Sequence, residues 1–298
     1  MIVAAVDLGT NTTRLLVGDV DDGRVEELHR ETRITRLGEG VEARRRLLPL
    51  PIARVRNALT DYRRTAESLG AERVLLVATS AVRDAENGEA FLGEIEWGYG
   101  FATRLLSGDE EAGLTRRGVG ELGAATLLVD VGGGSTELVL DGFRTSLPLG
   151  SVRLTERYGD DVGASIEATR AVLPELEPQD AVGVAATITS LAALDLGLEQ
   201  YDRSRVHGHV LARDAARAQL ERLAGLPLEE RRRLPALESN RAPVIVAGAA
   251  ILVAILEAYG LDSIRVSERD LLDGAALAAA ELPEPEEGAA PPGAYTCC

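Results

Sequence analysis

Apolar and polar residues alternate along the 298-residue chain in two different patterns. Short apolar runs typical of strands occur at residues 2–6 and 73–78, whereas residues 52–69 repeat their apolar positions at helical spacing. The longest apolar run, residues 242–256, contains Pro and Gly and is shorter than the roughly 20 residues that span a bilayer. We therefore interpret it as part of a buried helix and expect a globular α/β protein.

A second pattern is an internal repeat, in which a strand ending in Asp is followed by a turn of small residues and another strand. The first copy covers residues 6–16 and contains Asp7, and the second covers residues 129–139 and contains Asp130. Each copy predicts a hairpin with an exposed tip of small residues.

The elements after each hairpin also correspond. A third strand follows each hairpin, and helices then alternate with strands. The predicted strands are at 24–33, 73–78, 143–149, 181–185 and 263–267. The predicted helices are at 52–69, 109–117, from about 189, 244–259 and 268–280. Three leading strands followed by α/β crossovers, found twice, predict two related mixed-sheet domains that face each other across a cleft. We place these domains at residues 1–122 and 123–282, followed by a disordered tail at 283–298 that is rich in Pro, Glu and Ala.

Composition excludes several functions. All 32 basic residues are Arg, because the sequence contains no Lys. A Walker-type phosphate loop and a protein kinase both need a Lys on the phosphates, so neither operates here. The net charge of −16 argues against binding to nucleic acid or to an anionic membrane, which depends on a basic surface.

Cysteine usage and the first residues indicate the compartment. The only cysteines, Cys297 and Cys298, lie in the tail, so we expect no disulfide framework. The apolar segment 2–6 has no basic leader before it, so we expect no signal peptide and a cytoplasmic protein.

The tips of the repeated hairpins carry candidate phosphate-binding groups. In Gly132-Gly133-Gly134-Ser135, backbone N–H groups can approach an anion without obstruction by Cβ, and Ser135 adds a hydroxyl. One such turn alone is more often an ordinary hairpin turn. Two tips, each preceded by an Asp, favour opposed clamps around a phosphate chain.

Carboxylates beside the tips suit a divalent cation. Mg²⁺ prefers one or two carboxylates together with water and phosphate oxygens, so it would connect Asp7 and Asp130 with a bound phosphate. Glu137 lies beside the same tip as Asp130 and favours the metal role there. The alternative is an Asp that only fixes its turn.

Three acidic residues, Asp109, Glu110 and Glu111, open a predicted helix, where the helix dipole alone would explain them. Adjacent helical residues point about 100 degrees apart. Only one of Glu110 and Glu111 can therefore face the cleft, and spacing does not decide which.

Two further segments follow predicted strands. Arg83 comes shortly after strand 73–78, where it could hold phosphate bidentately or form a surface ion pair with Asp84 or Glu86. Residues 185–189 join a strand to a helix and form either an anion site or an N-cap. The pair His207 and His209 has no nearby third His and no Cys, so we do not favour a zinc site.

Six collinear motifs between residue 1 and about 280 resemble the exopolyphosphatase and guanosine pentaphosphate phosphohydrolase (Ppx/GppA) family. Its fold group includes actin, Hsp70 and sugar kinases, so the resemblance implies two ribonuclease H-like domains. The motifs are DLGTNT at 7–12, RLGEG at 36–40, ATSAVRDA at 78–85, SGDEEA at 107–112, VDVGGGSTEL at 129–138 and LLDG at 271–274.

Site roles are carried over from this resemblance by position. It implies that Glu111 is the catalytic base and that Asp130 and Glu137 serve the metal and the water. It also implies that phosphate is held by Asn11, Thr12, Arg83 and Gly132 to Ser135. One departure is Ala186, where many relatives have Gly. The chain resembles the short members of the family, which lack additional helical domains.

We therefore expect an exopolyphosphatase that releases terminal orthophosphate from inorganic polyphosphate with Mg²⁺, or Mn²⁺ as an alternative. One rival is hydrolysis of guanosine pentaphosphate (pppGpp); the aromatic content of 3% leaves few rings for base stacking and favours polyphosphate. Another is a non-catalytic sensor of nucleotide or alarmone, and a third is an ATP-dependent kinase of the same fold group. The resemblance also implies a homodimer, and we expect no nucleic-acid or membrane partner.

Overall fold

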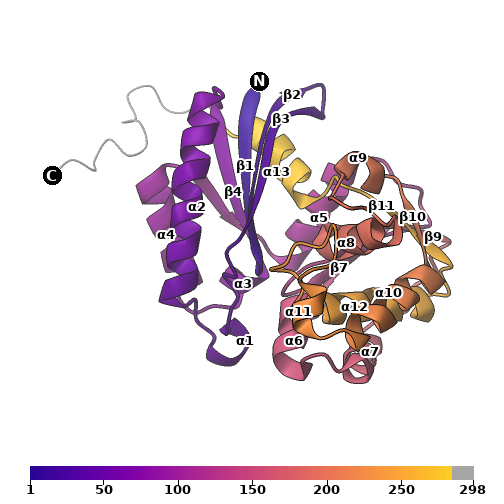
Figure 1. Cartoon of the computed structure of the whole chain (residues 1–298). Coiled ribbons are helices and arrows are strands. Elements are labelled where there is room, and N and C mark those ends of the chain that lie inside the picture. Colours follow the sequence, from indigo (N-terminus) through magenta and orange to yellow (C-terminus); the bar gives the residue numbers. More distant parts are fainter. Residues whose placement is uncertain (284–298) are drawn as a thin grey trace, which may run out of the picture. The chain divides into compact units, whose positions relative to one another are not determined.

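The computed structural model describes residues 1–283, which form two α/β units (Figure 1). Unit 1 comprises Met1–Gly118 and the chain from Leu271, and unit 2 comprises Val119–Asp270. Each unit contains one mixed sheet, with strand order β3-β2-β1-β4-β5 in unit 1 and β10-β11-β9-β6-β7-β8 in unit 2. The predicted class, α/β with two mixed-sheet domains, is confirmed.

Unit 1 begins with an antiparallel meander and continues with two strands parallel to β1. Its strands are β1 (Ile2–Leu8), β2 (Thr12–Asp21), β3 (Arg24–Ile34), β4 (Arg73–Ala78) and β5 (Ala102–Leu105). Its helices are α1 (Val41–Arg44), α2 (Pro49–Ser68), α3 (Ser80–Arg83), α4 (Gly88–Tyr99), α5 (Gly108–Val119) and α13 (Leu271–Ala280).

The central strand β1 is apolar on both faces, because both are covered by helices. Alternate residues point to opposite sides of a sheet. Val6 and Leu8 therefore belong to the core cluster that includes residues of α2 and α4, whereas Val3 and Ala5 belong to the cluster that includes residues of α13.

Unit 2 repeats the meander and parallel crossover. Its strands are β6 (Thr126–Val131), β7 (Thr136–Leu140), β8 (Phe143–Leu147), β9 (Asp180–Val184), β10 (Val210–Ala212) and β11 (Ser263–Val266). Its helices are α6 (Ser151–Tyr158), α7 (Val162–Arg170), α8 (Ala185–Asp195), α9 (Arg203–Val206), α10 (Arg213–Gly225), α11 (Leu228–Arg231) and α12 (Ile245–Ala258). Helix α12 is buried over nearly its whole length, as the apolar run predicts. None of the helices within residues 1–283 combines the length and apolar character that spanning a membrane requires.

The last helix differs from the sequence prediction, which placed residues 268–280 in a second domain at 123–282. Helix α13 begins at Leu271 and belongs to unit 1. The physical reason is that its apolar side chains cover the face of the sheet to which Val3 points. Unit 2 begins at Val119 rather than at 123. The tail predicted at 283–298 lies outside the described residues from 284 onward.

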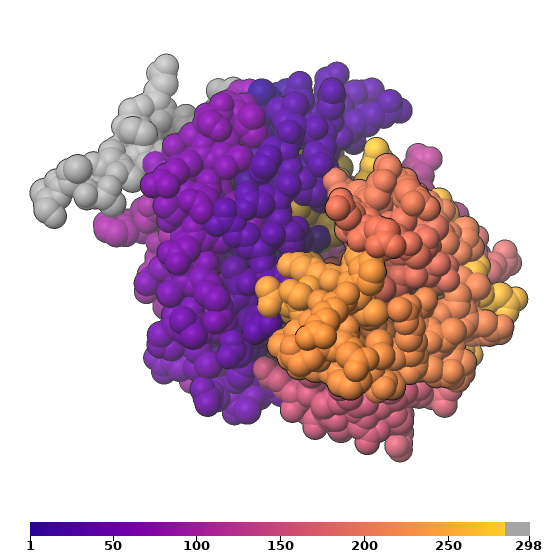
Figure 2. All heavy atoms as spheres, viewed as in Figure 1, coloured from indigo at the N-terminus to yellow at the C-terminus, as the bar shows by residue number. Residues whose placement is uncertain are grey.

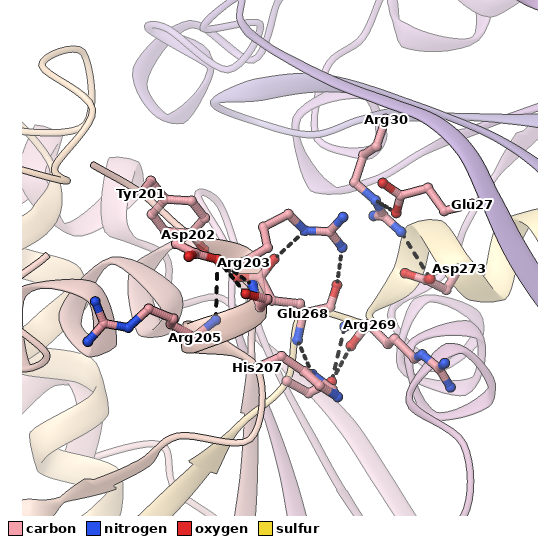
Figure 3. Close-up of polar contacts among 12 residues, drawn as sticks. Glu27, Arg30, Tyr201, Asp202, Arg203, Arg205, His207, Glu268, Arg269 and Asp273 are labelled. Atoms are coloured by element: carbon pink, nitrogen blue, oxygen red, sulfur yellow. Dashed lines mark hydrogen bonds and ion pairs between the residues drawn. The ribbon is translucent and has the colours of Figure 1, made fainter. Parts of the chain in front are cut away.

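Glu268 explains why α13 does not start earlier (Figure 3). Its backbone N–H donates to His207 Nδ1 at 3.1 Å, and its carboxylate accepts hydrogen bonds from Arg203 Nε at 2.9 Å and from the Tyr201 hydroxyl. Glu268 and these partners all belong to unit 2, and their contacts hold the segment before Leu271 outside the helix. Burial and Glu268 together raise the pKa of Tyr201.

Candidate active site

The tip of the β1–β2 hairpin in unit 1 is fixed by backbone hydrogen bonds. The Gly9 N–H donates to Thr12 O at 2.9 Å, and Asn11 O accepts from the N–H groups of Thr35 and Arg36 at 3.1 and 2.9 Å. The Gly38 N–H donates to Thr10 O at 2.8 Å, and a Cβ on Gly38 would lie 2.2 Å from Thr10 Cγ2. The motif at 36–40 therefore needs its first glycine to pack against this tip.

Asp7 lies directly across the hairpin from Arg14. Arg14 Nε and Nη2 approach Asp7 Oδ2 at 2.9 and 2.8 Å, and Asp7 is only 3% exposed. This buried ion pair neutralises the carboxylate within unit 1. The metal role of Asp7 stays a prediction, and the structure adds Arg14 as a partner that the sequence pattern did not indicate.

The carboxyl end of β4 lies beside the same tip. The Thr79 N–H donates to Leu8 O at 3.3 Å, and the hydroxyls of Thr10 and Ser80 are 2.9 Å apart. Because β1 and β4 are parallel neighbours, their carboxyl ends meet at one edge of the sheet. The predicted phosphate residues Asn11 and Thr12 thus share this edge with the loop that leads to Arg83.

Arg83 contacts Glu111 rather than forming only a surface ion pair. Its Nη1 lies 3.2 Å from Glu111 Oε2 and donates to Leu106 O at 2.6 Å. Glu111 is 7% exposed, although it lies in the first turn of α5. The structure therefore joins the predicted base and a predicted phosphate ligand in one partly buried contact.

Glu110 has a different local role from its neighbour Glu111. Its Oε2 accepts the backbone N–H and the hydroxyl of Ser107 at 2.8 and 2.7 Å, while the Glu110 N–H faces Ser107 Oγ at 3.3 Å. This reciprocal arrangement is a capping box at the start of α5. The hydrogen bonds from Ser107 lower the pKa of Glu110. Glu110 thus stabilises the helix end, and Glu111 alone of the two lies beside Arg83.

In unit 2 the corresponding cross-strand pair consists of two acids. Asp130 lies opposite Glu137 in the β6–β7 ladder, and the two residues are 7% and 2% exposed. Glu137 Oε1 accepts a hydrogen bond from Ser146 Oγ at 2.6 Å. Two buried carboxylates in opposed positions repel each other, and a hard divalent cation with oxygen ligands relieves that repulsion.

The two carboxylates of Asp130 and Glu137 are a donor set that is compatible with magnesium. Within residues 1–283, no group of three or more His, Cys, Asp or Glu side chains is placed to hold a metal ion. Mg²⁺ keeps several water ligands and needs only one or two carboxylates, so the Asp130 and Glu137 pair fits it. His207 contacts Glu268, whereas His209 Nε2 lies 2.8 Å from Asp195 Oδ2, so the two histidines serve separate contacts.

The Gly-rich tip of unit 2 is held by a helix that the sequence did not predict. Carbonyls of the tip accept hydrogen bonds from the start of α6: Ser151 N to Gly132 O at 2.9 Å and Val152 N to Gly133 O at 2.8 Å. Arg153 Nε donates to Gly134 O at 2.7 Å. These contacts fix the orientation of the peptide groups in the loop 132–135.

Gly150 is a second feature of this tip that sequence reasoning missed. A Cβ on Gly150 would lie 2.3 Å from Gly133 O and 2.5 Å from Gly134 N, so only glycine permits this approach. The available signal was the sequence Gly150-Ser151 directly after the third strand, which is a favourable start for a helix.

The start of α8 is the other candidate anion site of unit 2. The helix begins at Ala185 rather than near residue 189, and Ala185 has a φ of 67°, a left-handed conformation that is strained for a residue with Cβ. Its N-cap Val184 supplies no side-chain hydrogen bond, so the first amides of α8 are not capped in that way. The side-chain N-cap alternative is therefore wrong for this segment, and the anion site stays a prediction.

Comparison with known proteins identifies the family and several relatives of this chain. The model of the Ppx/GppA phosphatase family matches residues 16–281. Exopolyphosphatase 2 of Mycobacterium tuberculosis (strain ATCC 25618 / H37Rv) is 40% identical, over 93% of this chain and 98% of that protein. A guanosine-5'-triphosphate,3'-diphosphate pyrophosphatase of Photobacterium profundum is 28% identical, over 92% of this chain and 58% of that protein. The crystal structure of an exopolyphosphatase-like protein has a TM-score of 0.85 and 31% identity, covering 93% of this chain and 98% of that chain.

Proposed function

The chain belongs to the Ppx/GppA phosphatase family, and from that premise we propose that it is an exopolyphosphatase that releases terminal orthophosphate from inorganic polyphosphate. The relative named exopolyphosphatase 2 supports this choice, because the match covers nearly the whole of both chains. The observation that carries the proposal is the partly buried contact between Glu111 and Arg83, which places a carboxylate beside a guanidinium at the carboxyl edge of the unit 1 sheet.

Glu111 is the proposed general base. Its carboxylate would accept a proton from a water molecule while that water attacks the terminal phosphorus in line with the bond to the leaving chain. The new P–O bond forms as the anhydride bond breaks, and the products are orthophosphate and a chain shorter by one phosphate. Arg83 would orient Glu111 through their ion pair and present its remaining N–H groups to phosphate oxygens.

Backbone and hydroxyl groups would bind the substrate. Asn11 and Thr12 lie on the unit 1 tip, and residues 132–135 form the unit 2 tip that α6 orients. Tips fixed in advance reduce the ordering cost of binding a flexible phosphate chain.

Asp130 and Glu137 would hold Mg²⁺, with Mn²⁺ as an alternative. The bound cation supplies charge neutralisation to phosphate oxygens in the transition state. Glu137 is oriented for this role by its hydrogen bond from Ser146. Asp7 would contribute less to metal binding, because Arg14 contacts its carboxylate.

The second candidate is hydrolysis of pppGpp, which one relative's name supports. The two activities need the same phosphate chemistry and differ in whether a pocket binds the base. The test is release of orthophosphate in the presence of Mg²⁺ from short polyphosphate, long polyphosphate and pppGpp, measured side by side.

The decisive variant is Glu111→Gln, with Glu110→Gln as its matched control. We expect Glu111→Gln to bind substrate and to lose at least about a hundredfold in kcat, as expected for removal of a general base. Glu110→Gln should retain kcat, because Glu110 contacts Ser107 instead of Arg83. Near-normal turnover by Glu111→Gln would refute its assignment as base, and no release from any substrate with intact binding would favour the sensor alternative.

A further inference from the structure

An open pocket lies on unit 1 between α2 and α4. Its volume is about 660 Å³, within the range of roughly 300–1,000 Å³ that is typical of small-molecule sites. Both helices pack on the same face of the sheet (Figure 1). The space-filling view shows α2, coloured purple, on the surface of this unit (Figure 2).

The pocket lies away from the residues proposed for catalysis. It is lined by the end of α4, including Tyr99, which leads into the amino end of β5. Arg83 instead bonds to Leu106, just beyond the carboxyl end of β5. The two features therefore lie toward opposite ends of the same strand, and the pocket is not part of the candidate active site.

One wall of the pocket is a polar stripe along α2. The stripe consists of Arg56, Thr60, Arg63, Arg64 and Glu67, whose helical spacing places them on one face. A separate stripe that includes Val55, Leu59 and Tyr62 is buried in the core. The stripe of three arginines is therefore not required for packing α2 onto the sheet, and it gives a net-acidic protein a local concentration of guanidinium groups.

The other wall presents the only tryptophan of the chain. Trp97 on α4 is 74% exposed, in a protein with only 3% aromatic residues. At the neighbouring lining residue Gly98, an added Cβ would meet nothing within 4 Å, so the space beside the indole is open. A flat ligand ring can stack on an indole without displacing any other side chain.

The floor of the pocket is fixed by two hydroxyls. Thr60 Oγ1 and the Tyr99 hydroxyl donate to Arg56 O at 2.9 and 3.0 Å, which links α2 to α4. The Tyr99 ring also packs against Phe101 with centroids 5.7 Å apart. These contacts hold the two walls in place before any ligand binds.

The arginines can exchange their present partners for an anion. Arg56 pairs with Glu94 at 2.5 Å and Arg63 with Glu67 at 2.7 Å, and both pairs are solvent-accessible. Exposed ion pairs of this kind contribute only about 0–1 kcal/mol. A phosphate group that accepts bidentate hydrogen bonds from arginine can therefore replace a carboxylate at little cost.

We propose that this pocket binds a purine nucleoside phosphate, with the base stacked on Trp97 and the phosphates on Arg56, Arg63 and Arg64. Indole stacking recognises a planar base, and the arginine stripe recognises its phosphates. A contact with a second copy of this chain is less well matched, because the central part of a protein interface is depleted of charged residues and this pocket contains five.

The test uses the full chain in metal-free buffer, titrated with ATP, adenosine and inorganic tripolyphosphate. Binding to this pocket is followed by the fluorescence of Trp97, the single tryptophan, because heat would also report tripolyphosphate bound at the candidate active site. ATP should alter the fluorescence and bind at least about tenfold more tightly than adenosine or tripolyphosphate, because only ATP carries both recognised groups. Equal binding of all three, or ATP binding without a change in Trp97 fluorescence, would overturn the proposal.

Charge variants test the arginine stripe. Arg63→Gln should weaken ATP binding about tenfold or more, because it removes a charged donor. Glu94→Gln should strengthen binding, because it frees Arg56 from its carboxylate, whereas Glu89→Gln on the same helix makes the same charge change outside the pocket and should have no effect. Equal effects of the two glutamate variants would refute a specific site. Two results together would instead assign the surface to a second copy of this chain. Trp97→Ala would change the sedimentation coefficient, and the wild-type chain would not respond to ATP.

Discussion

The two repeated hairpins place different residues opposite their equivalent aspartates, Asp7 and Asp130. In unit 1, Asp7 lies across from Arg14 and forms a buried ion pair, whereas in unit 2, Asp130 lies across from Glu137. The backbone register is equivalent, and the difference is confined to one side chain on the second strand. The two hairpins therefore differ in the sign of the charge at one ladder position, which is positive in unit 1 and negative in unit 2.

This difference implies different contributions from the two units. An aspartate paired with arginine needs no external charge, so its hydrogen bonds stabilise the hairpin. Two opposed buried carboxylates need a compensating positive charge, supplied by the chain or by a cation, or they need a proton. We therefore interpret the Asp7 and Arg14 pair as structural support and propose cation binding for the Asp130 and Glu137 pair.

Exchanging the partner at the unit 2 tip should have the largest effect. Glu137→Arg would give Asp130 the type of partner that Asp7 has in unit 1, and it removes a proposed metal ligand. We expect phosphate release to fall at least about a hundredfold, since a metal supplies several kcal/mol of transition-state stabilisation. Calorimetric titration with Mg²⁺ and an orthophosphate assay measure the two effects, and a variant that keeps both would contradict the assignment.

Removing the partner at the unit 1 tip should mainly affect stability. Arg14→Leu leaves a buried carboxylate without its guanidinium, which costs about 3 kcal/mol in comparable buried pairs. Urea unfolding of the variant measures the loss, and Arg14→Lys, which keeps the positive charge, should lose less. Equal stability of Arg14→Leu and wild type would show that this pair is not structural.

Replacing Gly150, which packs against the Gly-rich tip of unit 2, should have an intermediate effect on stability and on substrate binding. Gly150→Ala adds a Cβ that would lie 2.3 Å from Gly133 O, so the tip or α6 must shift. Overpacking of this kind costs about 1–3 kcal/mol. We also expect weaker substrate binding, seen as a higher KM, whereas Gly225→Ala in α10, where nothing lies within 4 Å of the added Cβ and φ is not positive, should leave KM unchanged.

Replacing Glu110, which caps α5, should have the smallest effect on stability, and that effect should depend on pH. The pKa of Glu110 is lowered from its ordinary value of 4.5 in the folded state, so its ionised form contributes stability above that pH. This contribution disappears as pH falls through the lowered folded-state pKa. The Tm of Glu110→Gln should therefore be below that of wild type at neutral pH, and the difference should shrink in acid; a difference that does not change with pH would contradict the capping role.

Local patterns were sufficient for the parts of the molecule that depend on neighbouring residues. The β1–β2 and β6–β7 hairpins, strand 73–78 and helix α2 were all indicated by periodicity and turn residues. The sequence pattern also identified the loop 132–135, because glycine spacing is a local property. Helices α4, α6, α7 and α10 were among the elements that the sequence analysis missed, although the apolar residues of α6 lie on one face.

Long-range packing decided the rest. The placement of α13 in unit 1 depends on contacts between residues more than 200 positions apart, such as Arg73 Nη1 with Ala280 O, and no local pattern encodes them. The choice of Arg83 as the partner of Glu111 likewise required the turn after β4 to meet the start of α5. The amino-acid sequence by itself determined the repeated hairpins and the acidic and glycine residues beside them. Only the tertiary structure decided which of those charges are paired with one another, because charge pairing depends on distances that folding alone creates.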